Sequence, residues 1–226
     1  MHNATSKRFA GRLALAAAPI ALISFFLGPA AYAWDFDAVF DPVRALTYEG
    51  VDLGMVRWGW MLDIVGYYFL LLPVMLVLHD MGGEGSSLKR TSATACGIGY
   101  LISGSMGAAM LAASTGIFER YATGDAMTQA AELAVFLNMQ EIVFYGIWNI
   151  LCMSLFAVWG LTMGAVLRQH ERLLGLGLQV IGLAAAIDVF GTLLHLEWLS
   201  MTGLFTYLFG FPIWCAFLGV RWMRAK

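Results

Sequence analysis

Three carboxylic acids lie inside long apolar stretches of this chain, where a charged group is expensive. They are Asp63, Glu141 and Asp188. Ionisable residues within apolar helices are rare, and they usually belong to ion pathways, proton relays or binding sites. The chemistry that these acids could perform is the binding of a proton, a small cation or, together with a histidine, a metal ion.

Polar neighbours recur near each acid at the spacing of one helix face. Tyr67 lies four residues after Asp63, whereas Thr192 and His195 lie four and seven residues after Asp188. The same three- and four-residue steps join Glu141 to further side chains: Asn138, Tyr145, Trp148, Asn149 and Cys152. Because lipid would leave polar groups unsatisfied, we expect these faces to converge on one acidic cavity.

The depth of each acid can be estimated from its position in its apolar run. At about 1.5 Å per residue, Asp63, Glu141 and Asp188 are expected in one layer, in the outer half of the membrane. The cavity is therefore expected to open to the outside.

No lysine or arginine lies within the apolar runs to neutralise these acids. The acids can be protonated, they can pair with rim residues such as Arg57 or Arg120, or they can bind a cation, a cationic solute or a metal together with His195. The hypothesis is an outward-facing cation or proton site. The alternative is a set of unrelated hydrogen bonds between helices.

Composition indicates which elements must position these residues. Hydrophobic residues make up 60% of the 226 residues, and charged residues make up only 12%. Soluble domains carry about 25% charged residues, so this chain has too little charge to cover a water-facing surface. Six apolar runs are near or above the ~20 residues that a membrane-spanning helix needs; they cover residues 13–33, 58–78, 93–114, 137–167, 173–194 and 204–220. The sequence therefore predicts an all-α, six-span membrane bundle in a single domain.

The basic residues predict the orientation of these spans. If the spans alternate in direction, one side carries ten of the thirteen basic residues: Lys7, Arg8, Arg12, Lys89, Arg90, Arg168, Arg172, Arg221, Arg224 and Lys226. Cytoplasmic loops carry the excess of lysine and arginine, so both termini are predicted to be cytoplasmic.

The first apolar run permits a second interpretation. It has a basic start and ends in Ala31-Tyr32-Ala33, which resembles a signal-peptidase site. Cleavage there would leave five spans. The run is longer than the ~7–15 residues of a signal core, which favours retention as a span.

Residues other than these acids and their neighbours predict how the chain packs. Residues 34–57 are aromatic and acidic, and they are long enough to cap the outer opening. Pro73 and Pro212 fall inside predicted spans, where each removes a helical hydrogen bond. Glycine and alanine dominate 93–114 and 173–194, which indicates close packing of helices and permits homo- or hetero-oligomers through these faces.

Several function classes lack their sequence signatures. No G-x-S-x-G, H-E-x-x-H or nucleotide-binding glycine motif is present in context, so enzymatic activity is disfavoured. The three cysteines lack metal-ligand spacing, and no basic stripe suggests nucleic acid. No particular cofactor is indicated.

The layout resembles bacterial families of small six-span membrane proteins without known activity. The resemblance is carried by Trp58-Gly-Trp-Met-Leu-Asp63 running to Leu70-Leu-Leu-Pro73, by the small residues of 93–114, and by Leu167-Arg168 with Arg172-Leu-Leu-Gly-Leu-Gly177. It covers most of the chain and implies a bacterial inner-membrane location. No functional residue is transferred from it.

The function expected from these patterns is that of a small transporter or channel-like protein embedded in lipid. Its ligand would be a proton, a small cationic solute or a metal ion at the acidic site. The first alternative is a non-catalytic subunit or scaffold of a larger complex. An intramembrane enzyme that uses the carboxylates as acid and base is the third interpretation.

Overall fold

The computed structural model describes residues 4–82 and 87–224, which contain helices and no strand. Six helical spans are long and apolar enough to cross a membrane, and each overlaps one predicted run: Ala4–Ala31, Leu53–Met81, Leu88–Thr123, Ala126–His170, Arg172–Leu193 and Glu197–Met223. The prediction of an all-α bundle with six spans is therefore confirmed. Several spans are longer than predicted, most of all the third and the fourth.

Three spans are uninterrupted helices and three are composites. The uninterrupted helices are α1 (Ala4–Ala31), α10 (Arg172–Leu193) and α11 (Glu197–Met223). The second span joins α4 (Leu53–Asp63), a π-helix η1 (Ile64–Tyr68), a 3-10 helix η2 (Phe69–Leu71) and α5 (Leu72–Met81). The third joins α6 (Leu88–Ala113) to α7 (Thr115–Thr123), and the fourth joins α8 (Ala126–Gln140), a π-helix η3 (Glu141–Cys152) and α9 (Met153–His170).

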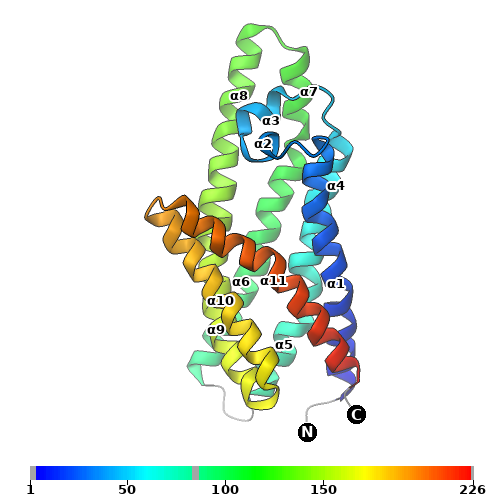
Figure 1. Ribbon diagram of the computed structural model, residues 1–226, viewed down its shortest axis with the longest axis vertical. Helices are drawn as coiled ribbons and strands as arrows, with labels where there is room; N and C mark the ends of the chain where they lie inside the picture. Colours follow the sequence, from blue (N-terminus) through cyan, green and yellow to red (C-terminus); the bar gives the residue numbers. More distant parts are fainter. Residues whose placement is uncertain (1–3, 83–86, 225–226) are drawn as a thin grey trace.

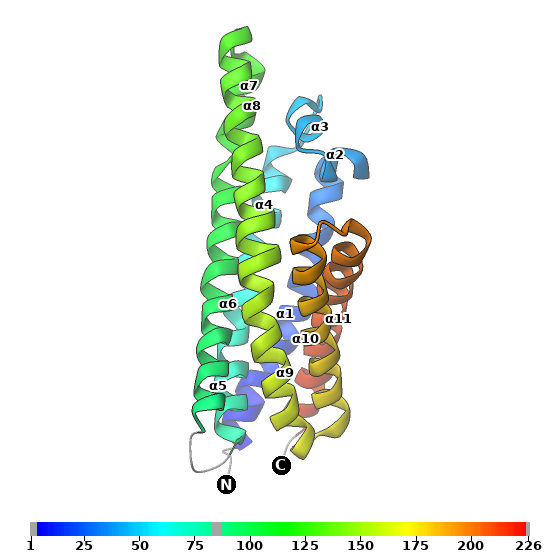
Figure 2. The same cartoon turned by 90° about the vertical axis from the view of Figure 1, so that its left-hand side faces the viewer.

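The helices run side by side, and the two ends of the bundle differ (Figure 1). The hairpin of α7 and α8 projects beyond the other helices, close to the short helices α2 (Phe36–Phe40) and α3 (Pro42–Thr47). We call this end the cap end. The hairpin of α10 and α11 is much shorter and does not reach the level of α7 (Figure 2). The start of α1 and the last turns of α11 lie together at the opposite end, where Gly11 packs against Trp222.

Side-chain caps define where several helices begin. Asp52 accepts a hydrogen bond from the Met55 N–H at 2.9 Å, and Asp125 accepts one from the Thr128 N–H at 2.9 Å. These bonds satisfy backbone donors that the first helical turn leaves free. The bond from the Thr128 backbone also lowers the pKa of Asp125.

The second span is irregular because Pro73 lacks a backbone N–H. In a regular helix that N–H would bond to the carbonyl of Phe69. The Leu72 N–H bonds to the Phe69 carbonyl instead, which produces the short 3-10 turn. The π-helix η1 precedes this turn directly, so the span changes its helical period twice within eight residues.

Small residues allow the helices to approach closely. A Cβ atom on Gly160 would lie 3.2 Å from the Cα of Gly182, and one on Gly97 would lie 2.6 Å from the Trp159 ring. The close packing predicted for the third and fifth spans is therefore present. These glycines are covered by other helices of the same chain, so they are not free to contact a second protein.

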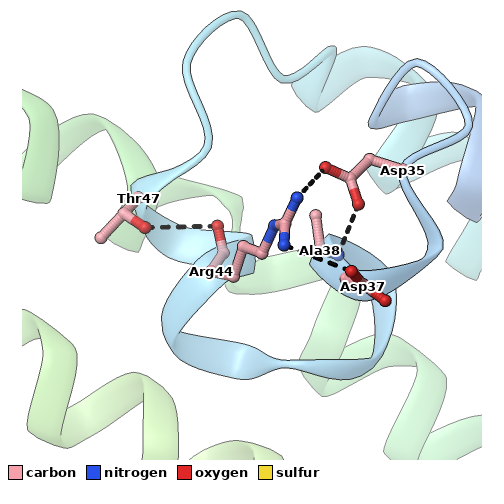
Figure 3. A network of polar contacts seen from close by, with 5 residues as sticks. All are labelled: Asp35, Asp37, Ala38, Arg44 and Thr47. Atoms are coloured by element: carbon pink, nitrogen blue, oxygen red, sulfur yellow. Dashed lines mark hydrogen bonds and ion pairs between the residues drawn. The ribbon is translucent and has the colours of Figure 1, made fainter.

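The segment 34–57 folds as a cap with an apolar core of its own. α3 packs against α7 and α8, and buried residues there include Ala45, Leu46 and Phe136. Arg44 pairs with Asp35 at 2.6 Å and with Asp37 at 3.3 Å (Figure 3). Partial desolvation raises the pKa of Asp35, but the hydrogen bonds from Arg44 and from the backbone of Ala38, together with the charge of Arg44, outweigh it, so the pKa lies below its ordinary value.

Candidate functional site

Asp188 is a fully buried carboxylic acid held between α10 and α11. Its relative exposure is 0%. The Ser200 hydroxyl on α11 donates to Oδ1 of Asp188 at 2.5 Å, and the Thr192 hydroxyl, one turn further along α10, lies 3.5 Å from the same oxygen. The two hydroxyls are 3.1 Å apart. Three side-chain oxygen groups from two facing helices therefore form one cluster.

The second carboxyl oxygen of Asp188 has no hydrogen-bond partner. Oδ2 is buried and unpaired. A buried acceptor without a partner costs about 1–3 kcal/mol, so such atoms are few in folded proteins and usually have a specific explanation. No lysine or arginine among the described residues forms an ion pair with this carboxyl group.

Close contact between backbones explains why Asp188 is so completely enclosed. A Cβ atom on Gly203 of α11 would lie 2.5 Å from the backbone nitrogen of Asp188. A Cβ atom on Gly191 would collide with the backbone of Ser200. The two glycines let the helices meet on either side of the acid.

His195 leaves the helix face on which it was predicted to lie. α10 ends at Leu193, and His195 adopts a left-handed backbone conformation with φ of 55°. The Leu196 N–H closes this turn on the Gly191 carbonyl at 2.8 Å. His195 is exposed in the turn, whereas the predicted pairing of Asp188 with Thr192 is present.

Asp63 occupies a different interface, between the second span and α1. Its carboxyl group receives one weak hydrogen bond, from Ser24 at 3.5 Å. The Ser24 hydroxyl also bonds to the Ala21 carbonyl at 2.7 Å. Asp63 is only partly buried, in contrast to Asp188. It is close enough to the hydroxyl groups of Tyr68 and Tyr207 to interact with them electrostatically.

Buried tyrosines join three spans beside Asp63. Tyr67 donates to the carbonyl of Leu208 on α11 at 2.7 Å. Tyr100 on α6 bonds to the Tyr67 carbonyl at 3.0 Å and to the Tyr207 hydroxyl at 2.5 Å. The predicted site residue Tyr67 is therefore part of a hydrogen-bonded network that links the second, third and sixth spans.

Aromatic rings of the second and fourth spans pack against one another. The Trp60 and Trp148 rings are 5.4 Å apart, and Phe144 is 5.0 Å from Trp148. The Trp148 indole N–H donates to the Gly104 carbonyl at 3.2 Å. Trp60 lies one turn before Asp63 on the same helix, so this ring cluster includes a neighbour of the acid along its own span.

Glu141 and Asn138 lie on an exposed surface, and not beside Asp63 or Asp188. Asn138 donates to the Ala134 carbonyl at 2.7 Å, and Asn149 is partly buried. Glu141 lies about 29 residues from His170, which is roughly 40 Å along the fourth span and exceeds a ~30 Å hydrocarbon core. Glu141 therefore shares no buried site with Asp63 or Asp188. The shared depth of the three acids stays a prediction.

Two features explain why the fourth span differs from its prediction. The helix begins at Ala126, eleven residues before the predicted run, so Glu141 lies well inside the helix and not in its first turns. The π-helix η3 also has a longer hydrogen-bond step than an α-helix, which rotates the polar stripe away from one face.

The three carboxyl groups have separate surroundings. Asp63 contacts Ser24, Asp188 contacts Ser200 and Thr192, and Glu141 is exposed. Arg120, a predicted rim partner, pairs with Glu132. Within residues 4–82 and 87–224, no group of three or more His, Cys, Asp or Glu side chains is placed to hold a metal ion.

Sequence reasoning missed the partners that the other helices contribute. Ser24 and Ser200 carry no pattern of their own, because hydroxyl residues are common in membrane helices. Tyr100 and Tyr207 could have been noticed as tyrosines inside apolar runs, where a hydroxyl needs a partner.

Comparison of the chain with protein-family models, with curated proteins and with solved structures finds no match. A functional assignment therefore depends on the geometry of these residues.

Proposed function

We propose that this protein is a small membrane transporter or channel-like protein in which Asp188 takes up and releases a proton. The observation that carries the proposal is the unpaired Oδ2 of a fully buried carboxyl group. A carboxyl group in that position is costly to maintain and is explained if it binds and releases an ion.

The surroundings of Asp188 favour a proton over a larger ion. The acid is fully enclosed, and its side-chain partners among the described residues are the hydroxyls of Ser200 and Thr192. Hydroxyl groups both donate and accept hydrogen bonds, so they can pass a proton to or from the acid. Thr192 is the residue before the last one of α10, which gives the proton a short path out of the helix pair.

We further propose that the protein lies in a bacterial inner membrane with both termini in the cytoplasm. The basic residues near the start of α1 and the end of α11 support this orientation, because cytoplasmic segments carry the excess of lysine and arginine. In this orientation the cap end is outside the cytoplasm and Asp188 lies in the outer half of the membrane.

Proton movement into liposomes tests the proposal. The purified protein is reconstituted with a pH-sensitive dye in the lumen, and a potassium diffusion potential is imposed. We expect protein-dependent acidification or alkalinisation that Asp188→Asn reduces to the rate of protein-free liposomes. Asp188→Glu should retain part of the rate, and Glu119→Gln on the exposed hairpin serves as the matched control. Equal rates for folded Asp188→Asn and the unmodified protein would refute the proposal.

A subunit or scaffold role is the second candidate, and the projecting hairpin favours it. α7 and α8 extend well beyond the other helices (Figures 1 and 2), and Met127 and Val135 are 76% and 53% exposed. Native electrophoresis after mild solubilisation tests this role. A large complex that dissociates with Met127→Glu would support it, and a particle of unchanged size would not.

A further inference from the structure

We infer that Asp63 and the aromatic rings around it form a binding site for a small organic ammonium ion. This inference depends on the proposed transport function and names a ligand class for it. It concerns a second carboxylate, in a different helix interface from Asp188.

The charge of Asp63 is available to a ligand. Its one hydrogen bond, from Ser24, is long at 3.5 Å. The ion pairs of the described residues involve Arg44, Arg120 and Arg221, and none of them includes Asp63. The residue as a whole is only partly buried, in contrast to Asp188. An uncompensated acid within a span is stabilised by a cationic partner.

Two aromatic residues lie one helical turn from Asp63 along the second span, and each packs against a ring of another span. Trp60 precedes Asp63 by one helical turn and its ring lies 5.4 Å from that of Trp148. Tyr67 follows Asp63 by one turn and its ring lies 6.0 Å from that of Tyr207. Aromatic faces attract organic cations, and quaternary ammonium groups are recognised in this way.

The available oxygen atoms do not favour a small metal ion at this position. The Tyr67 hydroxyl is committed to the Leu208 carbonyl, and the hydroxyls of Tyr100 and Tyr207 bond to each other. Hard metal ions require about six oxygen ligands, whereas this region offers one carboxylate and several ring faces. That combination fits an organic cation with apolar substituents.

The backbone is irregular in the second and fourth spans, which contribute Trp60, Tyr67 and Trp148. The π-helix η1 begins at Ile64, directly after Asp63, and η3 carries Phe144 and Trp148. Single π-helical turns occur frequently at functional sites. Their weaker hydrogen-bond pattern allows the ring positions to adjust to a ligand.

Binding of tetraethylammonium to the purified protein tests this inference. Isothermal titration is performed in detergent at constant ionic strength with sodium chloride as the balancing salt. We expect saturable binding that Asp63→Asn weakens about tenfold or more. Trp60→Leu should weaken binding several-fold, and Trp198→Leu, at an exposed position near the start of α11, is the matched control.

The outcomes separate this inference from the proposed function. Absence of saturable binding to the unmodified protein would overturn it, as would equal affinity for Asp63→Asn. If Asp63→Asn does not remain monodisperse, Trp60→Leu and Trp148→Leu decide, and unchanged affinity in both would overturn it. Asp188→Asn should still bind tetraethylammonium. Binding that depends on Asp63, combined with proton movement that does not depend on Asp188, would support the site and refute the proton proposal.

Discussion

The hydroxyl of Tyr67 donates to the carbonyl of Leu208, which lies four residues before Pro212. In a regular helix the N–H of residue 212 would occupy that carbonyl, and proline has none. The tyrosine of one span therefore supplies the hydrogen bond that the proline of another span removes. Within a membrane the hydrogen bond from Tyr67 matters, because no water is available to satisfy the Leu208 carbonyl.

Tyr67→Phe should destabilise the protein by about 0.5–2 kcal/mol, because it leaves the Leu208 carbonyl unsatisfied. The cost should be smaller when Pro212→Ala is also present, since the alanine N–H can then bond to Leu208. Unfolding free energies of the two single variants and the double variant in mixed micelles provide the test. Equal costs of Tyr67→Phe in both backgrounds would mean that the two residues are not coupled.

Gly203→Ala should destabilise the pairing of α10 and α11. Its new Cβ atom would lie 2.5 Å from backbone atoms of Ala184 and Asp188, and overpacking of this kind costs about 1–3 kcal/mol. Gly146→Ala is the control, because nothing lies within 4 Å of its new Cβ atom. A helical alanine is favoured over glycine, so the control should be neutral or stabilising. The same unfolding assay ranks the two variants, and equal stability would contradict the predicted contact.

Ser200→Ala should weaken the same pair of helices by about 0.6–1.7 kcal/mol, the range for hydrogen bonds between membrane helices. The variant leaves Asp188 with only the 3.5 Å contact from Thr192. Thr202→Ala is a suitable control, because the Thr202 hydroxyl donates to the carbonyl of Trp198 within its own helix and makes no hydrogen bond to a neighbouring helix among the described residues. If both variants lose the same stability, the bond between Ser200 and Asp188 contributes nothing specific.

The cap should respond to acid through Asp35. Because the pKa of Asp35 in the folded state is below its ordinary value of 3.8, the pairing with Arg44 contributes stability above pH 3.8. That contribution should be lost as the pH falls through the lowered pKa. A carboxyl-carbon NMR titration should show the lowered pKa in the unmodified protein and a higher one in Arg44→Gln. An identical titration of Asp35 in both proteins would exclude the ion pair as its cause.

The fold could be predicted from sequence because long apolar runs recur along the chain. Each apolar run long enough to cross a bilayer forms a helix, and the small residues of 93–114 and 173–194 lie at close helix contacts. The irregular turns could be predicted only in part. Pro73 indicated a break in the second span, but the π-helix η3 contains no proline and has no comparable signal in the sequence.

The candidate site could be predicted less completely, because it depends on which helices face each other. Asp188 and Thr192 share one helix face, as their spacing predicts, whereas Ser200 comes from the neighbouring helix. His195 was assigned to the same face because the end of α10 two residues earlier was not apparent from its spacing. The place of Glu141 well inside its helix was not apparent either, because the predicted run began later than the helix does.

The most direct test of the account is whether an organic cation gradient moves protons through the protein. Liposomes containing the protein and a pH-sensitive dye are exposed to an inward gradient of tetraethylammonium without a membrane potential. We predict a change of lumenal pH with the unmodified protein and none with Asp63→Asn or Asp188→Asn. The account would be contradicted if liposomes with the unmodified protein showed the same lumenal pH as protein-free liposomes. It would also be contradicted if the pH change remained in both Asp63→Asn and Asp188→Asn.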